Sequence, residues 1–169
     1  MTSHWEVEFQ PGTQYLSFVR AFIISLLLFS FLPIAEAATG KVLKVLPHFE
    51  DNQGRIALTP SLYDRDAYQA VLRRDPTKRS GLRFDIQYKA KGPVWQPLTI
   101  RVELRGIAQG NLPKELVLQK TVDRTKWFNR WTSIKLTDTE YQELGEVTAW
   151  RVTLWEGDWP LGEVKSFLW

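Results

Sequence analysis

Apolar and polar side chains alternate along most of the chain from residue 82 onward. In LRFDIQYKA (82–90) every second residue, beginning at Leu82, is apolar or aromatic, and the residues between are charged or carry an amide. PLTIRVELR (97–105) repeats the pattern. A period of two sustained over about eight residues predicts β-strands with one face in the core and the other in water.

Shorter segments of the same kind supply the remaining strands. They are expected at 41–49, 115–122, 131–136, 147–155 and 161–169, with a short pairing segment at 55–58. Pro47 suits an edge strand, because proline has no N–H to offer a neighbouring strand. About seven short strands separated by Gly and Pro turns predict an all-β fold, an antiparallel two-sheet immunoglobulin-like sandwich.

Two segments break the alternation and predict short helices. SLYDRDAYQAVLRR (61–74) begins with Ser61 and Asp64 at the spacing of a capping box. The side that we expect to face the core consists of Tyr63, Ala67, Ala70 and Val71. TDTEYQELG (137–145) predicts a second helix that ends at Gly145. Its place before the penultimate strand resembles the helical crossover of many immunoglobulin-like domains.

The first 37 residues are predicted to be a signal peptide. AFIISLLLFSFL (21–32) is an apolar run after Arg20, and Ala35-Glu36-Ala37 puts small residues at positions −3 and −1 of a cut before Ala38. The run is shorter than the about 20 residues that a membrane-spanning helix needs. We therefore expect residues 38–169 to be one domain, exported to the periplasm or surface of a bacterium. An uncleaved inner-membrane anchor at 21–35 is the alternative.

The charge balance is mildly basic. The chain has 22 Lys and Arg against 19 Asp and Glu, a net charge of +3. Residues 1–37 hold three glutamates and one arginine, so the predicted exported domain carries +5. This charge is compatible with anionic partners without requiring them, and export makes nucleic acid an unsuitable one. RRDPTKR (73–79) gathers four cations, and its candidate contacts with an anionic surface are Arg73, Arg74, Lys78 and Arg79. A solvated loop is the alternative.

The composition removes several kinds of chemistry. The chain has no cysteine, and His48 is the only histidine after residue 37, so a zinc or copper site and a histidine-based triad lack their residues. Glycoside hydrolysis needs two carboxylates, and Asp64 with Asp66 or Glu156 with Asp158 are the nominal candidates. Neighbours two apart on a helix point in different directions. We therefore expect no catalytic centre, no metal and no cofactor.

Tryptophan is concentrated in the predicted C-terminal hairpin, where four of the last 23 residues are Trp. A three-residue turn at 156–158 sets Trp155 opposite Trp159 and pairs Arg151 with Glu163. In this register Trp155 and Trp159 form an exposed cross-strand pair. The core face then consists of Trp150, Val152, Leu154, Val164 and Leu168, and Phe167 and Trp169 take the outer face.

A second aromatic cluster, RTKWFNRW (124–131), interleaves cations with aromatic rings. If Ile134 and Leu136 face the core, the parity of the strand turns Trp131 outward, where it can stack on a sugar ring or an aromatic group. A lid of aromatic side chains over the open end of the sandwich is the alternative. The candidate ligand-binding residues are Trp127, Arg130, Trp131, Trp155 and Trp159.

These features predict a non-catalytic binding or assembly domain. The first hypothesis is a protein-interaction module that uses a sheet edge or the outer aromatic face. The second is a carbohydrate-binding domain with an exposed tryptophan platform. A terminal aromatic also resembles the closing strand of an outer-membrane barrel, but Arg151, Glu163 and Lys165 interrupt the apolar band that lipid requires.

Overall fold

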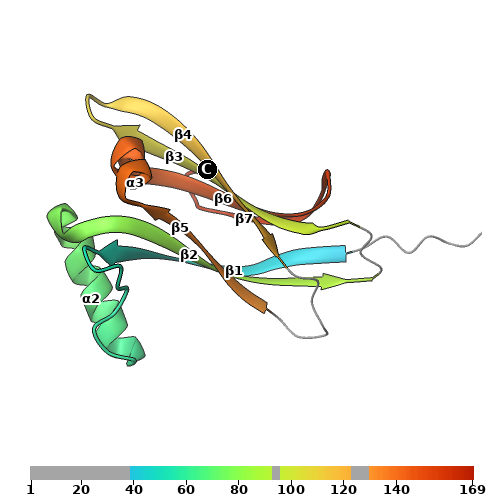
Figure 1. Cartoon of the computed structure of the whole chain (residues 1–169), viewed down its shortest axis with the longest axis horizontal. Helices are drawn as coiled ribbons and strands as arrows, with labels where there is room; N and C mark the ends of the chain where they lie inside the picture. The colour runs from blue at the N-terminus through green and yellow to red at the C-terminus, as the bar shows by residue number, and fades with distance from the viewer. Residues whose placement is uncertain (1–38, 93–95, 123–129) are drawn as a thin grey trace, which may run out of the picture. The chain divides into compact units, whose positions relative to one another are not determined.

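The computed structural model describes residues 39–92, 96–122 and 130–169, which belong to one compact unit, Ala37–Trp169. They form two antiparallel sheets, of three and four strands, and two short helices (Figure 1). The prediction of a mostly β chain with about seven strands is confirmed. In this part of the chain no helix is both long enough and apolar enough to cross a membrane. The predicted signal peptide lies outside the described residues.

The three-stranded sheet has the order β1-β2-β5, with β1 (Thr39–Asp51) and β5 (Arg130–Thr137) on either side of β2 (Arg79–Lys91). β1 is therefore an edge strand, as Pro47 predicts. The four-stranded sheet has the order β4-β3-β6-β7. Its strands are β3 (Leu98–Ala108), β4 (Leu112–Val122), β6 (Glu146–Glu156) and β7 (Trp159–Lys165).

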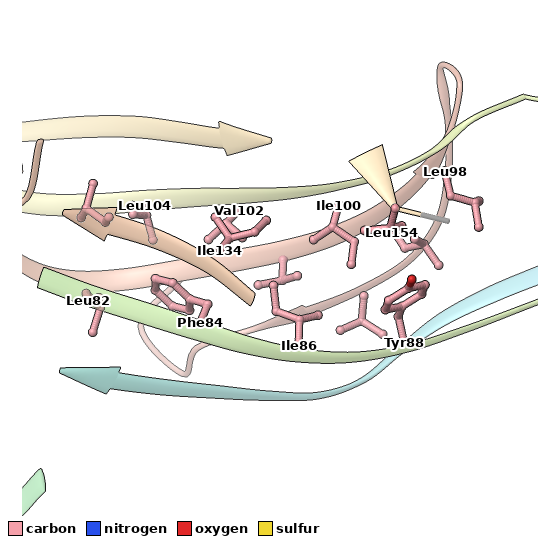
Figure 2. Packing of buried hydrophobic residues seen from close by; sticks show 14 of the residues in the cluster. Leu82, Phe84, Ile86, Tyr88, Leu98, Ile100, Val102, Leu104, Ile134 and Leu154 are labelled. Atoms are coloured by element: carbon pink, nitrogen blue, oxygen red, sulfur yellow. The ribbon is translucent and has the colours of Figure 1, made fainter. Parts of the chain in front are cut away.

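Buried side chains from both sheets meet in one core (Figure 2). The alternating residues of β2 and β3 supply most of it: Leu82, Phe84, Ile86, Tyr88, Leu98, Ile100, Val102 and Leu104 are each at most 4% exposed. Ile134 and Leu136 of β5 join them, as their parity predicts. Trp150 packs edge-on against Phe84 with ring centroids 6.1 Å apart. The period-two reading of the sequence therefore identifies the core face correctly.

Helix α2 (Leu62–Arg74) begins where it is predicted, with the Ser61 hydroxyl accepting from the backbone N–H of Asp64. Its packed face is not the predicted one, since Tyr63 and Val71 are exposed. The helix instead buries Gln69 and Leu72. A 3-10 turn, Pro76–Lys78, follows. The segment 55–58 forms no strand.

Helix α3 (Asp138–Leu144) also forms as predicted and ends at Gly145. Gly145 has φ +73°, in the left-handed region that favours glycine, and its N–H bonds to the carbonyl of Tyr141. The Thr137 side chain makes no capping hydrogen bond.

The predicted register of the C-terminal hairpin is wrong. The turn is two residues, Gly157-Asp158, and a bulge follows Leu154, so Trp155 lies opposite Pro160 and Glu156 opposite Trp159. Trp155 and Trp159 therefore form no cross-strand pair. β7 ends at Lys165, and Leu168, which we expected in the core, is 69% exposed.

Candidate functional site

The outer face of the three-stranded sheet, the face turned away from the core, is a continuous polar surface. The strand registers place on it Lys41, Lys44, Leu46, His48 and Glu50 from β1, Arg83, Asp85, Gln87, Lys89 and Lys91 from β2, and Trp131, Ser133 and Lys135 from β5. This arrangement follows from the same alternation that builds the core, because residues between the buried positions point the other way.

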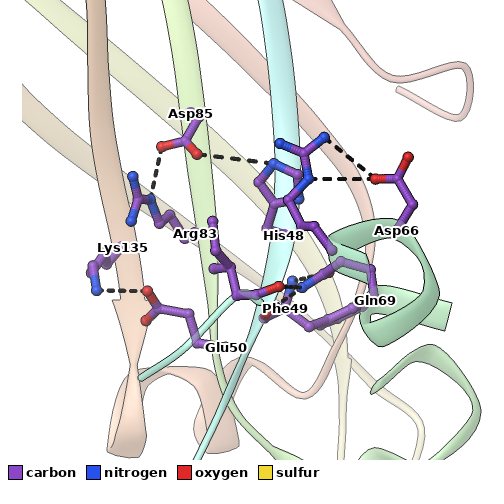
Figure 3. A network of polar contacts seen from close by, with 10 residues as sticks. His48, Phe49, Glu50, Asp66, Gln69, Arg83, Asp85 and Lys135 are labelled. Atoms are coloured by element: carbon purple, nitrogen blue, oxygen red, sulfur yellow. Dashed lines mark hydrogen bonds and ion pairs between the residues drawn. The ribbon is translucent and has the colours of Figure 1, made fainter. Parts of the chain in front are cut away.

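Helix α2 lies against β1 at one end of this face. Gln69 is 1% exposed, and its side-chain amide accepts from the N–H of Phe49 (2.8 Å) and donates to the carbonyl of Phe49 (2.8 Å) (Figure 3). The amide thus occupies part of the free edge of β1 as a neighbouring strand would. Arg65, one turn before Gln69, is brought by this docking to the outer face.

A pocket of about 390 Å³ is present where α2 meets the outer face. It is lined by Leu46, His48, Arg65, Arg83, Asp85, Trp131, Thr132 and Ser133. Its size falls within the range of about 300–1,000 Å³ that small-molecule sites occupy. The lining combines an aromatic wall with several hydrogen-bonding groups.

His48 is the buried polar group of this pocket, at 7% exposed. Its Nε2 has no hydrogen-bond partner among the described residues, and Asp85 Oδ2 lies 3.9 Å from it. Burial and the nearby Arg65 charge lower the pKa of His48 from its usual 6.5, while Asp85 opposes the change. The imidazole is therefore neutral near pH 7, with one ring nitrogen facing Asp85 across a gap too long for a direct bond (Figure 3).

Ion pairs hold the carboxylates around the pocket. Arg83 Nε donates to Asp85 Oδ1 at 2.7 Å. Lys135 Nζ lies 2.6 Å from Oε1 of Glu50, a carboxylate that is 2% exposed. Arg65 contacts the exposed Asp66 at a looser 3.3 Å (Figure 3). Asp85 keeps its second oxygen toward His48, so one acceptor faces into the pocket.

Arg130 and Trp131, two of the candidate ligand-binding residues, lie on opposite faces of β5. Trp131 is 50% exposed, as its parity predicts, and it lines the pocket. Arg130 pairs with Tyr88, whose side chain is in the core, so Arg130 lies on the other parity of β5 and does not line the pocket. Trp127 lies outside the described residues.

Trp155 and Trp159 belong to the four-stranded sheet and are not brought to the pocket. The Arg101 guanidinium stacks over Trp155 at 4.8 Å, and Trp155 Nε1 is buried without a hydrogen-bond partner among the described residues. Trp159 is 75% exposed at the hairpin tip. The ring of Trp169, near the other end of β6, contacts the guanidinium groups of Arg105 (4.2 Å) and Arg151 (4.8 Å). These rings are covered by cations from the same sheet, except Trp159.

The cations of 73–79 take structural roles in part. Arg79 donates to the carbonyls of Leu72 and Arg73 at the C-terminus of α2 and stacks on Phe49 at 4.1 Å. Lys78 pairs with Asp75 at 3.2 Å. Arg73 and Arg74 occupy the last turn of α2, where positive charge complements the helix dipole.

Sequence reasoning missed most of the pocket. His48, Arg65 and Asp85 are far apart in the chain, and no local motif connects them. The available signal was the polar parity of 82–90, which turns Arg83 and Asp85 away from the core. No cluster of three His, Cys, Asp or Glu suited to a metal ion occurs within residues 39–92, 96–122 and 130–169.

Comparison with protein-family models, curated proteins and solved structures finds no match for this chain. The function proposed below therefore rests on the geometry of the outer face.

Proposed function

We propose that this chain is an exported, non-catalytic carbohydrate-binding domain and that the pocket beside α2 holds a sugar ring. One observation carries the proposal: the half-exposed ring of Trp131 lines the same pocket as the buried His48, whose Nε2 has no hydrogen-bond partner in the described part of the chain. An exposed aromatic ring offers a sugar a flat apolar surface, and an unpartnered buried nitrogen is costly unless a ligand completes its hydrogen bond.

The proposal also assigns the two sheets to a known type of sandwich. The order β1-β2-β5 and β4-β3-β6-β7 is what an immunoglobulin-like sandwich gives when its fourth strand joins the second sheet. The helix α3 before the penultimate strand supports the same assignment. We therefore propose an immunoglobulin-like sandwich without the disulfide, since the chain has no cysteine.

The spacing of His48 and Asp85 suits a hydroxyl group. A hydroxyl oxygen that accepts from a protonated Nε2 and donates to Asp85 Oδ2 can bridge two atoms 3.9 Å apart with two bonds of ordinary length. A sugar presents hydroxyls that donate and accept at once. The pairing of Asp85 with Arg83 fixes the carboxylate in place for this contact.

The carboxylates in and around the pocket favour binding over hydrolysis. Asp85, Glu50 and Asp66 each have a cation within 3.3 Å. A glycosidase needs one carboxyl group that keeps its proton and a second one facing it across the scissile bond. Of these three carboxylates only Asp85 lines the pocket, and a binding role requires neither a second carboxyl group nor a proton donor.

A glycan array with wild-type protein and two tryptophan variants tests the proposal. We expect Trp131→Ala to abolish binding and Trp159→Ala to preserve it, because Trp159 is exposed but lies outside the pocket. Circular dichroism and urea unfolding establish that both variants fold. Loss of binding in Trp159→Ala alone, or no binding by wild-type protein to any glycan, contradicts the proposal.

Strand β4 supports a second candidate function, a protein partner that adds to a sheet edge. Within the described residues β4 pairs only with β3, so its other edge is open, and Val117 is 50% exposed. The β1 edge is less suitable, because Pro47 has no N–H and Gln69 occupies Phe49. A partner identified from a periplasmic extract should be lost in Val117→Lys and retained in Trp131→Ala. The opposite pattern excludes this edge.

A further inference from the structure

Four lysines gather at the end of the outer face opposite α2. Lys41 of β1 lies directly opposite Lys89 of β2, and Lys91 follows on the same face. Lys44, beyond the bulge in β1, lies opposite Gln87. Like charges directly across a strand pair destabilise a sheet. None of the four lysines has an ion-pair partner among the described residues.

A second pocket, of about 350 Å³, lies at this end. Lys41, Lys89 and Lys91 line it together with Thr39, Gly40 and Leu43, and none of the described lining residues is acidic. This differs from the pocket beside α2, where each guanidinium has a carboxylate within 3.3 Å. Within the described part of the chain, the lysine end therefore presents positive charge that no carboxylate offsets.

The two pockets are parts of one surface. The row Lys44, Gln87 and Trp131 runs across the sheet between them, as the pairing of Gln87 with both strands shows. Successive rows on one face are two residues apart, about 6.6 Å along a strand. The lysine row at Lys41 and Lys89 is one row from Trp131, and the row at Asp85 is one row beyond it on the other side.

We infer that the ligand of the outer face is an acidic polysaccharide, with a sugar ring at Trp131, hydroxyls at His48 and Asp85, and carboxylate or sulfate groups at the lysine end. This inference rests on the proposed function. A chain of acidic sugars satisfies both ends at once, because its rings supply hydroxyls and its acid groups offset the Lys41–Lys89 repulsion. A phospholipid surface satisfies only the lysines and leaves His48 Nε2 without a partner.

Pairs of oligosaccharides that differ only in charge test the inference. We would titrate the full chain with oligogalacturonate and its methyl ester, and with chondroitin sulfate and unsulfated, carboxyl-reduced chondroitin, by calorimetry at low and high salt. We expect the acidic member of at least one pair to bind roughly tenfold or more tightly than the neutral one, with the advantage reduced by salt. Equal affinity within every pair overturns the inference and leaves the proposed function standing. No binding by any member, together with a blank glycan array, removes both.

Two variants of equal charge change locate the acid groups. In the first variant, glutamine replaces Lys41, Lys44, Lys89 and Lys91. This variant should lose the roughly tenfold tighter binding of the acidic oligosaccharide over the neutral one, while its affinity for the neutral sugar stays unchanged. In the second variant, glutamine replaces four cations on other surfaces, Arg73, Arg74, Lys114 and Lys165. This variant should keep the preference for the acidic oligosaccharide. The first variant should also be at least as stable to urea as the wild type, since the repulsion is relieved. Equal loss in both variants overturns the inference.

A membrane surface is the competing outcome. Phosphatidylglycerol–phosphatidylcholine vesicles are offered to wild-type protein and to Trp131→Ala. We expect weak vesicle binding relative to the acidic oligosaccharide. Vesicle binding that exceeds oligosaccharide binding, depends on the four lysines and survives Trp131→Ala overturns the inference in favour of a lipid surface.

Discussion

At the scale of single residues, the Asp51 carboxylate joins several segments of the fold. Asp51 is 5% exposed, and its carboxylate accepts from the backbone N–H groups of Gln53 and Arg55, from the Arg55 guanidinium and from the Tyr68 hydroxyl at 2.7 Å. Although burial opposes ionisation, these hydrogen bonds hold the pKa of Asp51 well below its usual range. Asp51 therefore joins the end of β1, the following turn and α2.

Replacing Asp51 tests that role. We expect Asp51→Ala to lower the free energy of unfolding by about 2–4 kcal/mol, because it leaves buried donors without an acceptor. Asp51→Asn should cost less, since one acceptor oxygen remains. Glu146→Ala, which removes an exposed carboxylate at the start of β6, should change stability by less than about 0.5 kcal/mol. Urea unfolding at pH 7 measures all three, and equal costs for Asp51→Ala and Glu146→Ala refute the assignment.

His48 predicts a pH dependence of stability. Its pKa is lowered in the fold by burial and by Arg65, so between that lowered value and 6.5 the unfolded chain binds the extra proton and the folded chain does not. Stability is therefore complete above pH 6.5 and falls as the pH drops below it. Urea unfolding at pH 7.5 and 5.5 should show a larger loss for wild type than for His48→Gln. Identical losses in the two proteins contradict a neutral buried His48.

Asp51 and His48 show that the sequence alone does not reveal which distant side chains surround a polar residue. The alternation along 82–90 predicts which side chains leave the core, but not what covers them afterwards. His48 is buried because α2, which is far from it in sequence, packs against β1. Trp131, whose environment depends on strand parity alone, was predicted correctly.

At the scale of elements, α2 is held by polar contacts that an apolar periodicity cannot reveal. Gln69, with bonds to Phe49 and to the carbonyl of Ile56, occupies a position that hydrophobic patterning assigns to an apolar side chain. The predicted apolar side was therefore the wrong one. An amide is preferred here because the edge of β1 offers a free N–H and carbonyl.

Gln69→Leu tests this docking. The variant keeps a similar volume but removes three hydrogen bonds, so we expect a loss of about 2–3 kcal/mol in unfolding free energy and faster hydrogen exchange at the Phe49 amide. Val71→Ala, at an exposed position of the same helix, is the control and should leave Phe49 protection unchanged. Unchanged protection in Gln69→Leu would show that other contacts hold α2.

The hairpin of β6 and β7 shows why local charge pairing chose the wrong register. The prediction paired Arg151 with Glu163 across the turn. Arg151 instead makes a two-point contact with Glu103 of β3, at 2.5 and 2.9 Å, which also lowers the pKa of Glu103. Trp155 similarly meets Arg101 of β3. Partners on a neighbouring strand far away in the sequence outweigh those across the turn.

At the scale of the whole described unit, the outer faces of the two sheets differ in how many of their polar and aromatic side chains contact a partner on the same sheet. On the four-stranded sheet, arginines cover the rings of Trp155 and Trp169, and Glu103 pairs with Arg151, although Trp155 Nε1 has no hydrogen-bond partner among the described residues. On the three-stranded sheet, His48 Nε2 is unpartnered among the described residues and Trp131 is half exposed. The second face is therefore the one to which we assign the proposed ligand.

The most direct test is a ¹H–¹⁵N NMR titration with the tightest oligosaccharide from the array. We predict shifts confined to the outer face of the three-stranded sheet, at residues 44–50, 83–91 and 131–135, with the Trp131 indole N–H among the most affected. Shifts centred on the β4 edge or on the hairpin tip at Trp159, with the Trp131 indole unmoved, would contradict a sugar site at His48 and Asp85.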